Sequence, residues 1–199
     1  MDQFNPSLRR AAVTITLVKA SEDPDANNIP WSIEQKNEAA VLLTRRSNKL
    51  NKHAGQWALP GGSIDRDESA EQAALRELNE EVGLTLGHDA IIGRLDDYTT
   101  RSGFCITPVV VWGDVASELV ANPDEVASIH RIPLKEFLRE DSPMLETIPE
   151  SKHPVLKMPI GDSWIAAPTA AVLYQFREVA ILGRATRVAH FEQPYFAWR

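Results

Sequence analysis

The chain has 199 residues and a formal net charge of −7, and this acidic balance disfavours sequence-independent nucleic-acid binding, which depends on Lys and Arg to neutralise phosphates. Hydrophobic residues make up 43% of the chain and charged residues 25%, which is typical of a globular protein and fits a single domain over residues 1–199. No apolar run approaches the roughly 20 residues that span a bilayer, and the single cysteine excludes an internal disulfide, so we expect a cytoplasmic protein with no membrane or nucleic-acid partner.

The first part of the chain predicts two strands with an insertion between them. Residues 11–19 are rich in β-branched side chains and residues 38–46 contain a second apolar run, so we predict a strand in each. Residues 21–37 contain two prolines and three asparagines without a clear period, which indicates a surface insertion, with disorder as the alternative. A polar, basic stretch then leads to the short apolar segment 57–59.

The clearest helix is predicted over residues 69–82. Ser69 and Gln72 have the spacing of a capping box, and Gly83 stands where a left-handed residue commonly ends a helix.

The remaining elements alternate between strands and a few helices. We predict strands over residues 89–99, 104–115 and 126–132, a short helix over 134–139, an irregular stretch over 140–159, a helix over 169–182, and a tail over 184–199 that we leave unassigned. This order favours an α/β sandwich with a mixed sheet over a Rossmann fold.

Three glutamates share one side of the predicted 69–82 helix. Glu77, Glu80 and Glu81 are spaced i, i+3 and i+4, which puts their side chains within an arc of roughly 100 degrees. Like charges at this spacing repel each other, and near the end of a helix they also oppose the helix dipole. A solvated acidic face, with Arg76 paired to Glu80, is the ordinary explanation. The functional explanation is a set of oxygen ligands for Mg²⁺.

The sequence around these glutamates distinguishes the two explanations. Residues 62–84 read GSIDRDESAEQAALRELNEEVGL and resemble the Nudix box: Gly, five residues, Glu, seven residues, then Arg-Glu-aliphatic-any-Glu-Glu-any-Gly-aliphatic. All specified positions are filled, by Gly62, Glu68, Arg76, Glu77, Leu78, Glu80, Glu81, Gly83 and Leu84. Chance agreement at one starting point is below about one in a billion on uniform composition, so the resemblance favours the metal-binding explanation.

The resemblance implies a Nudix-type α/β/α sandwich with a mixed sheet. It also implies a divalent cation, Mg²⁺ with Mn²⁺ as the alternative, that bridges the protein and a diphosphate substrate. Glu77 and Glu81 carry over as the leading metal ligands and Glu80 as a third or water-mediated ligand. Backbone carbonyls near Gly61 and Gly62 carry over as further ligands.

Other residues have supporting roles in the same resemblance. Arg76 would orient the catalytic glutamates, Glu68 would steady the loop before the helix, and Gly83 would close the helix. Glu125 lies outside the motif, and it is either an additional metal ligand or base, or a plain turn glutamate.

Upstream of the box, residues 42–62 read LLTRRSNKLNKHAGQWALPGG. This stretch resembles the extra signature of the coenzyme A diphosphatase branch of the Nudix enzymes. Asn51 departs from the signature by replacing an arginine, and Leu59 departs from it by replacing a phenylalanine. By resemblance, the reaction would convert coenzyme A or acyl-coenzyme A to 4'-phosphopantetheine and adenosine 3',5'-bisphosphate.

The same stretch contains a strip of basic residues in an otherwise acidic chain: Arg45, Arg46, Lys49 and Lys52. A charged surface loop is the ordinary explanation. The place of the strip directly before the box favours a clamp for the phosphates of a substrate.

Alternatives remain open at this stage. The substrate could be another nucleoside diphosphate compound, such as ADP-ribose, NADH or a dinucleoside polyphosphate. A non-catalytic Nudix-like ligand-binding domain is the alternative of a different class, and it predicts a damaged carboxylate set, whereas the set here is intact. The aromatic residues of the 184–199 tail have enough apolar area to dock onto the domain or onto a second subunit of a homodimer.

Overall fold

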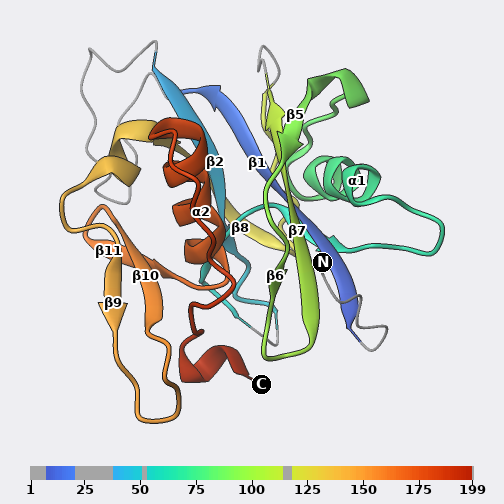
Figure 1. Ribbon diagram of the computed structural model, residues 1–199. Coiled ribbons are helices and arrows are strands. Elements are labelled where there is room, and N and C mark those ends of the chain that lie inside the picture. The colour runs from blue at the N-terminus through green and yellow to red at the C-terminus, as the bar shows by residue number, and fades with distance from the viewer. Residues whose placement is uncertain (1–7, 21–37, 51–52, 114–117, 199) are drawn as a thin grey trace.

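The structure, a computed structural model, describes residues 8–20, 38–50, 53–113 and 118–198. A central sheet separates two helices, with α1 (Ala70–Val82) on one face and α2 (Thr169–Phe176) on the other (Figure 1). The α/β/α sandwich that the sequence predicts is therefore confirmed. The predicted insertion over residues 21–37 lies outside the described residues.

Within the described ranges, eight strands form the central sheet. They are β1 (Arg9–Lys19), β2 (Ala39–Arg46), β3 (Trp57–Ala58), β4 (Gly61–Ser63), β5 (Ile91–Arg94), β6 (Tyr98–Thr99), β7 (Phe104–Trp112) and β8 (Val126–Pro133). Strand β1 runs parallel to β7 and antiparallel to β2 and β4, so the sheet is mixed as predicted.

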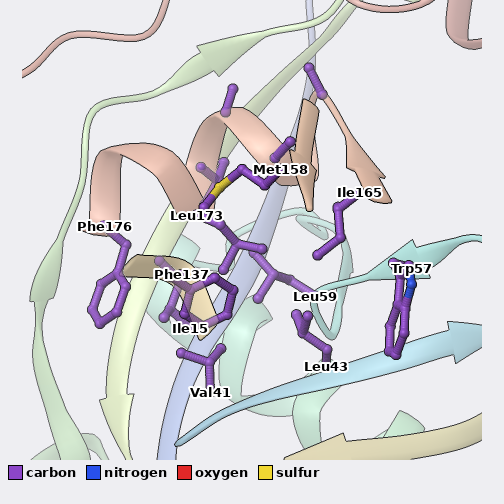
Figure 2. Close-up of a cluster of buried hydrophobic side chains, with 14 of the residues drawn as sticks. Ile15, Val41, Leu43, Trp57, Leu59, Phe137, Met158, Ile165, Leu173 and Phe176 are labelled. Atoms are coloured by element: carbon purple, nitrogen blue, oxygen red, sulfur yellow. The ribbon is translucent and has the colours of Figure 1, made fainter. Parts of the chain in front are cut away.

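Alternate side chains of the central strands pack against different helices. Ile15, Val41 and Leu43 belong to a buried cluster that includes residues of α2 (Figure 2), whereas Ala12 and Leu42 belong to a second cluster with residues of α1. Successive side chains of a strand point to opposite faces of the sheet. Strands covered on both faces read as continuous apolar runs, which is why the first two strands can be predicted from composition.

Helix α1 begins and ends at the residues that the sequence predicts. The Ser69 hydroxyl accepts a hydrogen bond from the Gln72 backbone N–H at 3.1 Å, and the Gln72 side chain accepts one from the Ser69 N–H at 2.8 Å. Gly83 ends the helix with φ of 72°, and its N–H donates to the Asn79 carbonyl at 2.9 Å. These two caps set where the helix begins and ends, so all three glutamates lie within it.

The prediction of an irregular stretch over residues 140–159 is wrong. Part of it joins a second, three-stranded antiparallel sheet made of β9 (Met144–Glu146), β10 (Val155–Ile160) and β11 (Ser163–Ala166). Strand β10 is buried on both faces except at Lys157, so it shows no alternation of polar and apolar residues. The strand also contains Pro159, which pairs with Trp164 of β11. In the sequence alone, a proline at this place argues against a strand.

Two other predicted elements differ in detail. The predicted 89–99 strand is divided into a short 3₁₀ turn (His88–Ala90), β5 and β6, and the register of β5 against β7 shifts at Gly93. The predicted 169–182 helix is confirmed in extent, although α2 continues as a π-helix over Arg177–Ile181. The predicted 134–139 helix is a 3₁₀ helix (Leu134–Leu138).

The tail docks onto its own domain. Arg101 forms a bidentate ion pair with Glu192, with N–O distances of 2.9 and 2.6 Å. The Tyr98 hydroxyl donates a hydrogen bond to the Phe191 carbonyl at 2.9 Å. The tail ends in a 3₁₀ turn over Tyr195–Trp198. Within the part of the chain that the structure describes, no helix is long and apolar enough to cross a membrane.

Candidate metal centre and adjoining cavity

Three carboxylates converge beside the C-terminal half of α1. One oxygen each from Glu77, Glu81 and Glu125 can be chosen so that all three lie within 4.8 Å of one another. Within the described residues, no other group of three potential metal ligands meets this spacing. Hard carboxylate oxygens in a compact group are the donors that Mg²⁺ and Mn²⁺ prefer, so the cluster fits a divalent cation.

The local sequence explains how each carboxylate reaches the cluster. Glu77 and Glu81 are one helical turn apart on α1, which places them on the same side of the helix. Glu125 comes from the loop before β8, and this loop is fixed at both ends. The Asn122 N–H donates to the Glu81 carbonyl at 2.9 Å, and the Ser47 N–H donates to the Glu125 carbonyl at 2.8 Å.

The cluster is electrostatically unfavourable when no cation is bound. The pKa of Glu81 is raised to about 8, chiefly by burial and also by the neighbouring Glu77 and Glu125, although Arg46 and a backbone hydrogen bond from Gly61 act to lower it. Burial also raises the pKa of Glu77, against the opposing effect of Arg76. Carboxylates held together against their own repulsion indicate a partner of positive charge.

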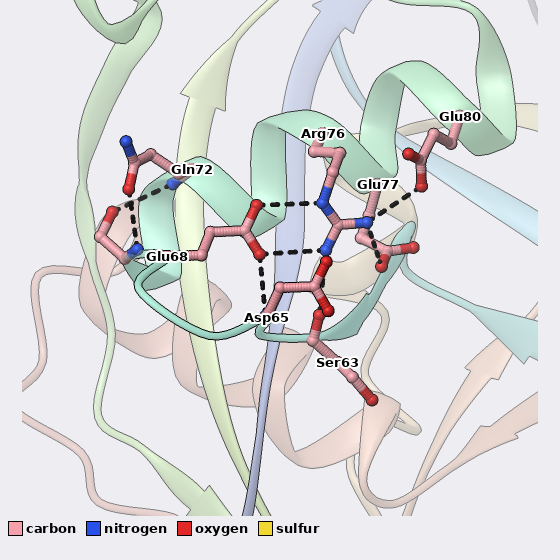
Figure 3. A network of polar contacts seen from close by, with 8 residues as sticks. Ser63, Asp65, Glu68, Gln72, Arg76, Glu77 and Glu80 are labelled. Atoms are coloured by element: carbon pink, nitrogen blue, oxygen red, sulfur yellow. Dashed lines mark hydrogen bonds and ion pairs between the residues drawn. The ribbon is translucent and has the colours of Figure 1, made fainter.

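Arg76 connects the loop before α1 to the carboxylates (Figure 3). Its guanidinium donates to both Glu68 oxygens at 3.0 and 3.1 Å, to the Ser63 carbonyl at 3.0 Å, to Glu77 at 2.8 Å and to Glu80 at 3.0 Å. Glu68 also accepts from the Asp65 N–H at 3.0 Å. In this arrangement Glu68 ties the loop to Arg76, and Arg76 holds the Glu77 carboxylate, while the supporting roles of the two residues in a reaction stay a prediction.

Two adjacent glycines pack against different parts of the site. A Cβ on Gly61 would overlap the Ala12 carbonyl oxygen and lie 2.6 Å from the Val13 Cα, so Gly61 allows β4 to approach β1. A Cβ on Gly62 would instead overlap the carboxylate of Glu77, with its Cδ at 2.5 Å. Gly61 therefore faces rigid backbone, and Gly62 faces the movable end of a candidate ligand.

This difference predicts that alanine at position 61 mainly lowers stability and that alanine at position 62 mainly lowers turnover. Gly61→Ala should lower the free energy of unfolding by about 3 kcal/mol, because backbone atoms cannot yield to the new methyl group. Gly62→Ala should leave stability within about 1 kcal/mol of wild type but lower turnover roughly a hundredfold, because it displaces the Glu77 carboxylate by about 1 Å. Urea denaturation and Mg²⁺-dependent turnover measure the two effects. Equal stability losses in the two variants would contradict the assignment.

A cavity of about 500 Å³ adjoins the carboxylates. Gly61 and Arg46 both line it, and the same two residues act on Glu81, so cavity and cluster share a border. Residues 163–169 and Ala197 also line it. Trp57, Leu59 and Ile165, which line the cavity, lie beside one another in the core cluster (Figure 2).

The predicted site residues fall into three groups. Glu77 and Glu81 come together, and Glu125 joins them, which favours the ligand role over the plain turn glutamate that the sequence left open. Glu80 lies outside this set, because its half-exposed carboxylate pairs with Arg76, and its role as a ligand stays a prediction. Gly62 lies against Glu77.

The predicted basic strip is only partly assembled. Arg45 and Arg46 line the cavity. Lys49 instead forms an exposed ion pair with Asp124 at 2.8 Å, and Lys52 lies outside the described residues. The sequence does not indicate that residues 163–169 line a cavity, because apolar residues of a cavity wall and of a core have the same pattern.

Comparison with known proteins identifies relatives of this chain. The family model described as NUDIX domain matches residues 29–152. An uncharacterised Nudix hydrolase named NudL from Yersinia enterocolitica is 45% identical over 105 residues, which cover 51% of this chain and 53% of the relative. A NudL from Pectobacterium atrosepticum is 37% identical over 138 residues, covering 68% of this chain and 72% of the relative.

The chain thus spans about half the length of the first of these relatives. Among solved structures, the Nudix hydrolase RenU from M. smegmatis matches with a TM-score of 0.52 at 20% identity, over 90% of this chain and 89% of that chain. At this identity the similarity supports the fold alone.

Proposed function

The chain belongs to the NUDIX domain family, and from this premise we propose that it is a Mg²⁺-dependent hydrolase that cleaves a diphosphate linkage in a nucleotide-derived metabolite. The observation that carries the proposal is the convergence of Glu77, Glu81 and Glu125 at the border of a cavity that also contains two arginines. Mn²⁺ is the alternative cation. The single cysteine favours the cytoplasm as the place of action.

The residues of the site have separate tasks in this reaction. Glu77, Glu81 and Glu125 would hold the cation, which would supply charge neutralisation and Lewis acidity toward the phosphorus. Arg76 keeps the Glu77 carboxylate in place through a hydrogen bond of 2.8 Å. Arg46 lines the cavity and its positive charge acts on Glu81 of the cluster. Its guanidinium can pair with a phosphate oxygen. Phosphoryl chemistry depends mainly on such placement and charge stabilisation.

We further propose coenzyme A or an acyl-coenzyme A as the substrate, with 4'-phosphopantetheine and adenosine 3',5'-bisphosphate as products. The upstream resemblance over residues 42–62 supports this choice, and Arg45 and Arg46 of that stretch line the cavity. The replacement of the signature arginine by Asn51 removes one cationic fork. Another nucleoside diphosphate compound is therefore the alternative.

A substrate panel tests both levels of the proposal. With Mg²⁺ present, we expect kcat/KM for coenzyme A to exceed that for ADP-ribose, NADH and a dinucleoside polyphosphate by at least about tenfold, which corresponds to about 1.4 kcal/mol of differential transition-state binding. Product identification by mass spectrometry should give the two phosphate monoesters. A higher rate on another compound would overturn the choice of substrate, and no turnover of any diphosphate would overturn the hydrolase.

A further inference from the structure

The tail makes contact with both sheets of the fold (Figure 1). Toward the central sheet, the Glu192 carboxylate forms its bidentate ion pair with Arg101, which lies in the turn between β6 and β7. Toward the second sheet, the Glu192 N–H donates to the Pro154 carbonyl at 2.9 Å, and the Leu156 N–H donates to the Glu192 carbonyl at 3.4 Å. Glu192 therefore links the two sheets, one through its side chain and the other through its backbone.

The cavity of about 500 Å³ has walls from the same two sheets. Val13 of β1 and Ile106 of β7 line it from the central sheet, and the residues of β11 line it from the second sheet. Ala197, which follows Glu192 closely in the chain, also lines it, and its N–H donates to the Pro194 carbonyl at 2.9 Å. A link between the two sheets therefore also affects how far apart the walls of the cavity lie.

Strand β10 is anchored at both of its ends, and Glu192 provides one of the two anchors. The other anchor holds Gly161, directly after β10: its N–H donates to Glu136 at 2.8 Å, and its carbonyl accepts from Arg139 at 2.9 Å. Loss of the Glu192 anchor would therefore release one end of β10 while the other end stays fixed. We expect the second sheet to loosen in that case and not to unfold.

The ion pair is stronger than an ordinary pair on a protein surface. Glu192 is only 8% exposed, and it also accepts a hydrogen bond from the Gln193 N–H at 2.9 Å. The hydrogen bond from Arg101 is the main cause that lowers the pKa of Glu192 to about 2, so the carboxylate is charged at neutral pH. Removal of one partner leaves the other charge buried and uncompensated, which is costly.

We propose that the Arg101–Glu192 ion pair is a clamp that sets the width of the cavity by holding the second sheet against the central sheet. Neither residue lines the cavity, so both act as positioning residues through β11 and Ala197. That the ligand of this cavity is the substrate rests on the proposed function. The clamp itself rests on the contacts of Glu192 with both sheets.

Hydrogen–deuterium exchange read by mass spectrometry tests the clamp without any ligand. We expect Arg101→Met to speed the exchange of protected amides in peptides covering residues 154–167 and 188–197 about tenfold, and to leave α1 unchanged, because only the clamped segments open more often. Unchanged exchange over residues 154–167 would overturn the clamp.

Arg94→Met is the matched control for this measurement. The Arg94 side chain is 46% exposed, against 45% for Arg101, and it pairs with Glu71 of α1 instead of the tail. We expect this variant to leave the exchange of residues 154–167 at the wild-type rate. An equal increase in both variants would show a general loss of stability and would also overturn the clamp.

Steady-state kinetics test the effect of the clamp on the substrate. For the best substrate of the panel, we expect Arg101→Met to raise KM about tenfold and to change kcat by less than about threefold, because the carboxylate cluster lies on other elements. Glu192→Gln keeps an oxygen for the Gln193 N–H and should have the same effect. The double variant should be no worse than either single one, since both remove the same contact.

A merely structural role makes a different kinetic prediction. It would lower the fraction of active protein, so kcat would fall and KM would stay at the wild-type value, and this result would overturn the positioning role. The exchange measurement needs no turnover, so it separates the clamp from the reaction. A loosened second sheet in a protein that hydrolyses no diphosphate would support the clamp and overturn the hydrolase. Normal hydrolysis with unchanged exchange and unchanged KM in Arg101→Met would do the reverse.

Discussion

Glu81→Gln is expected to lower kcat at least about a thousandfold, which corresponds to about 4 kcal/mol of lost transition-state stabilisation. Glu81 is the most deeply buried of the three converging carboxylates, at 4% exposure, and it lies at the border of the cavity. Glutamine keeps the shape of the side chain but removes the negative charge that holds a divalent cation. Mg²⁺-dependent product release on the best substrate of the panel measures the loss.

The same variant should be at least as stable as wild type when cations are removed. Burial and two neighbouring carboxylates raise the pKa of Glu81 to about 8 in the folded protein, from 4.5 when it is unperturbed. The folded state therefore binds more protons than the unfolded state between these pH values, and wild-type stability falls as the pH rises from about 4.5 through 8. Glu81→Gln removes this loss of stability, which we expect to amount to about 4 kcal/mol at pH 8.

Urea denaturation in EDTA at pH 5 and pH 8 measures this effect, with Mg²⁺ added back in a parallel series. We expect wild type to gain stability from Mg²⁺ at pH 8 and the variant to gain none, because only the folded wild-type cluster binds the ion. Full activity in Glu81→Gln, or a pH dependence of stability as steep as that of wild type, would contradict a cation site at this residue.

Glu125→Gln and Glu80→Gln form the second decisive comparison. Glu125 shares the cluster with Glu77 and Glu81, whereas Glu80 pairs with Arg76 and has 52% of its side chain exposed. We expect Glu125→Gln to lower kcat about a hundredfold and to raise the Mg²⁺ concentration for half-maximal activity about tenfold. Glu80→Gln should change each value by less than about tenfold, because a screened, exposed ion pair contributes little.

A Mg²⁺ titration of turnover for the two variants and wild type distinguishes the roles. The two substitutions remove the same charge from the same kind of side chain, so each is the control for the other. A larger loss in Glu80→Gln than in Glu125→Gln would restore Glu80 as the third ligand that the resemblance implies.

The sequence predicts those parts of the fold whose physical signal is local. Helix α1 is predictable because Ser69, Gln72 and Gly83 specify its two ends, and the first two strands because they are continuous apolar runs. The second sheet is not predictable in the same way, because β10 is buried on both faces and contains Pro159. Its strands are stabilised by other segments that cover them, and this tertiary contribution leaves no pattern in the sequence of the strands themselves.

The candidate site shows the same division. Glu77 and Glu81 can be placed together from helical spacing alone. Glu125 lies more than 40 residues further along the chain, and its approach depends on hydrogen bonds of Asn122 and Ser47 to other elements. Trp57 reads as a packing residue, and nothing local in the sequence indicates that it also lines the cavity.

The wall of the cavity and the carboxylate cluster come from different parts of the chain. The three converging glutamates lie at positions 77, 81 and 125. Part of the cavity wall comes from positions 163–169 and 197, which lie beyond the 29–152 family match. Substitutions at positions 163–169 and 197 are therefore expected to change which ligands the cavity accepts and to leave the carboxylate cluster intact. Exchange of that terminal segment between homologues would be an economical route to new substrate preferences, in evolution and in the laboratory.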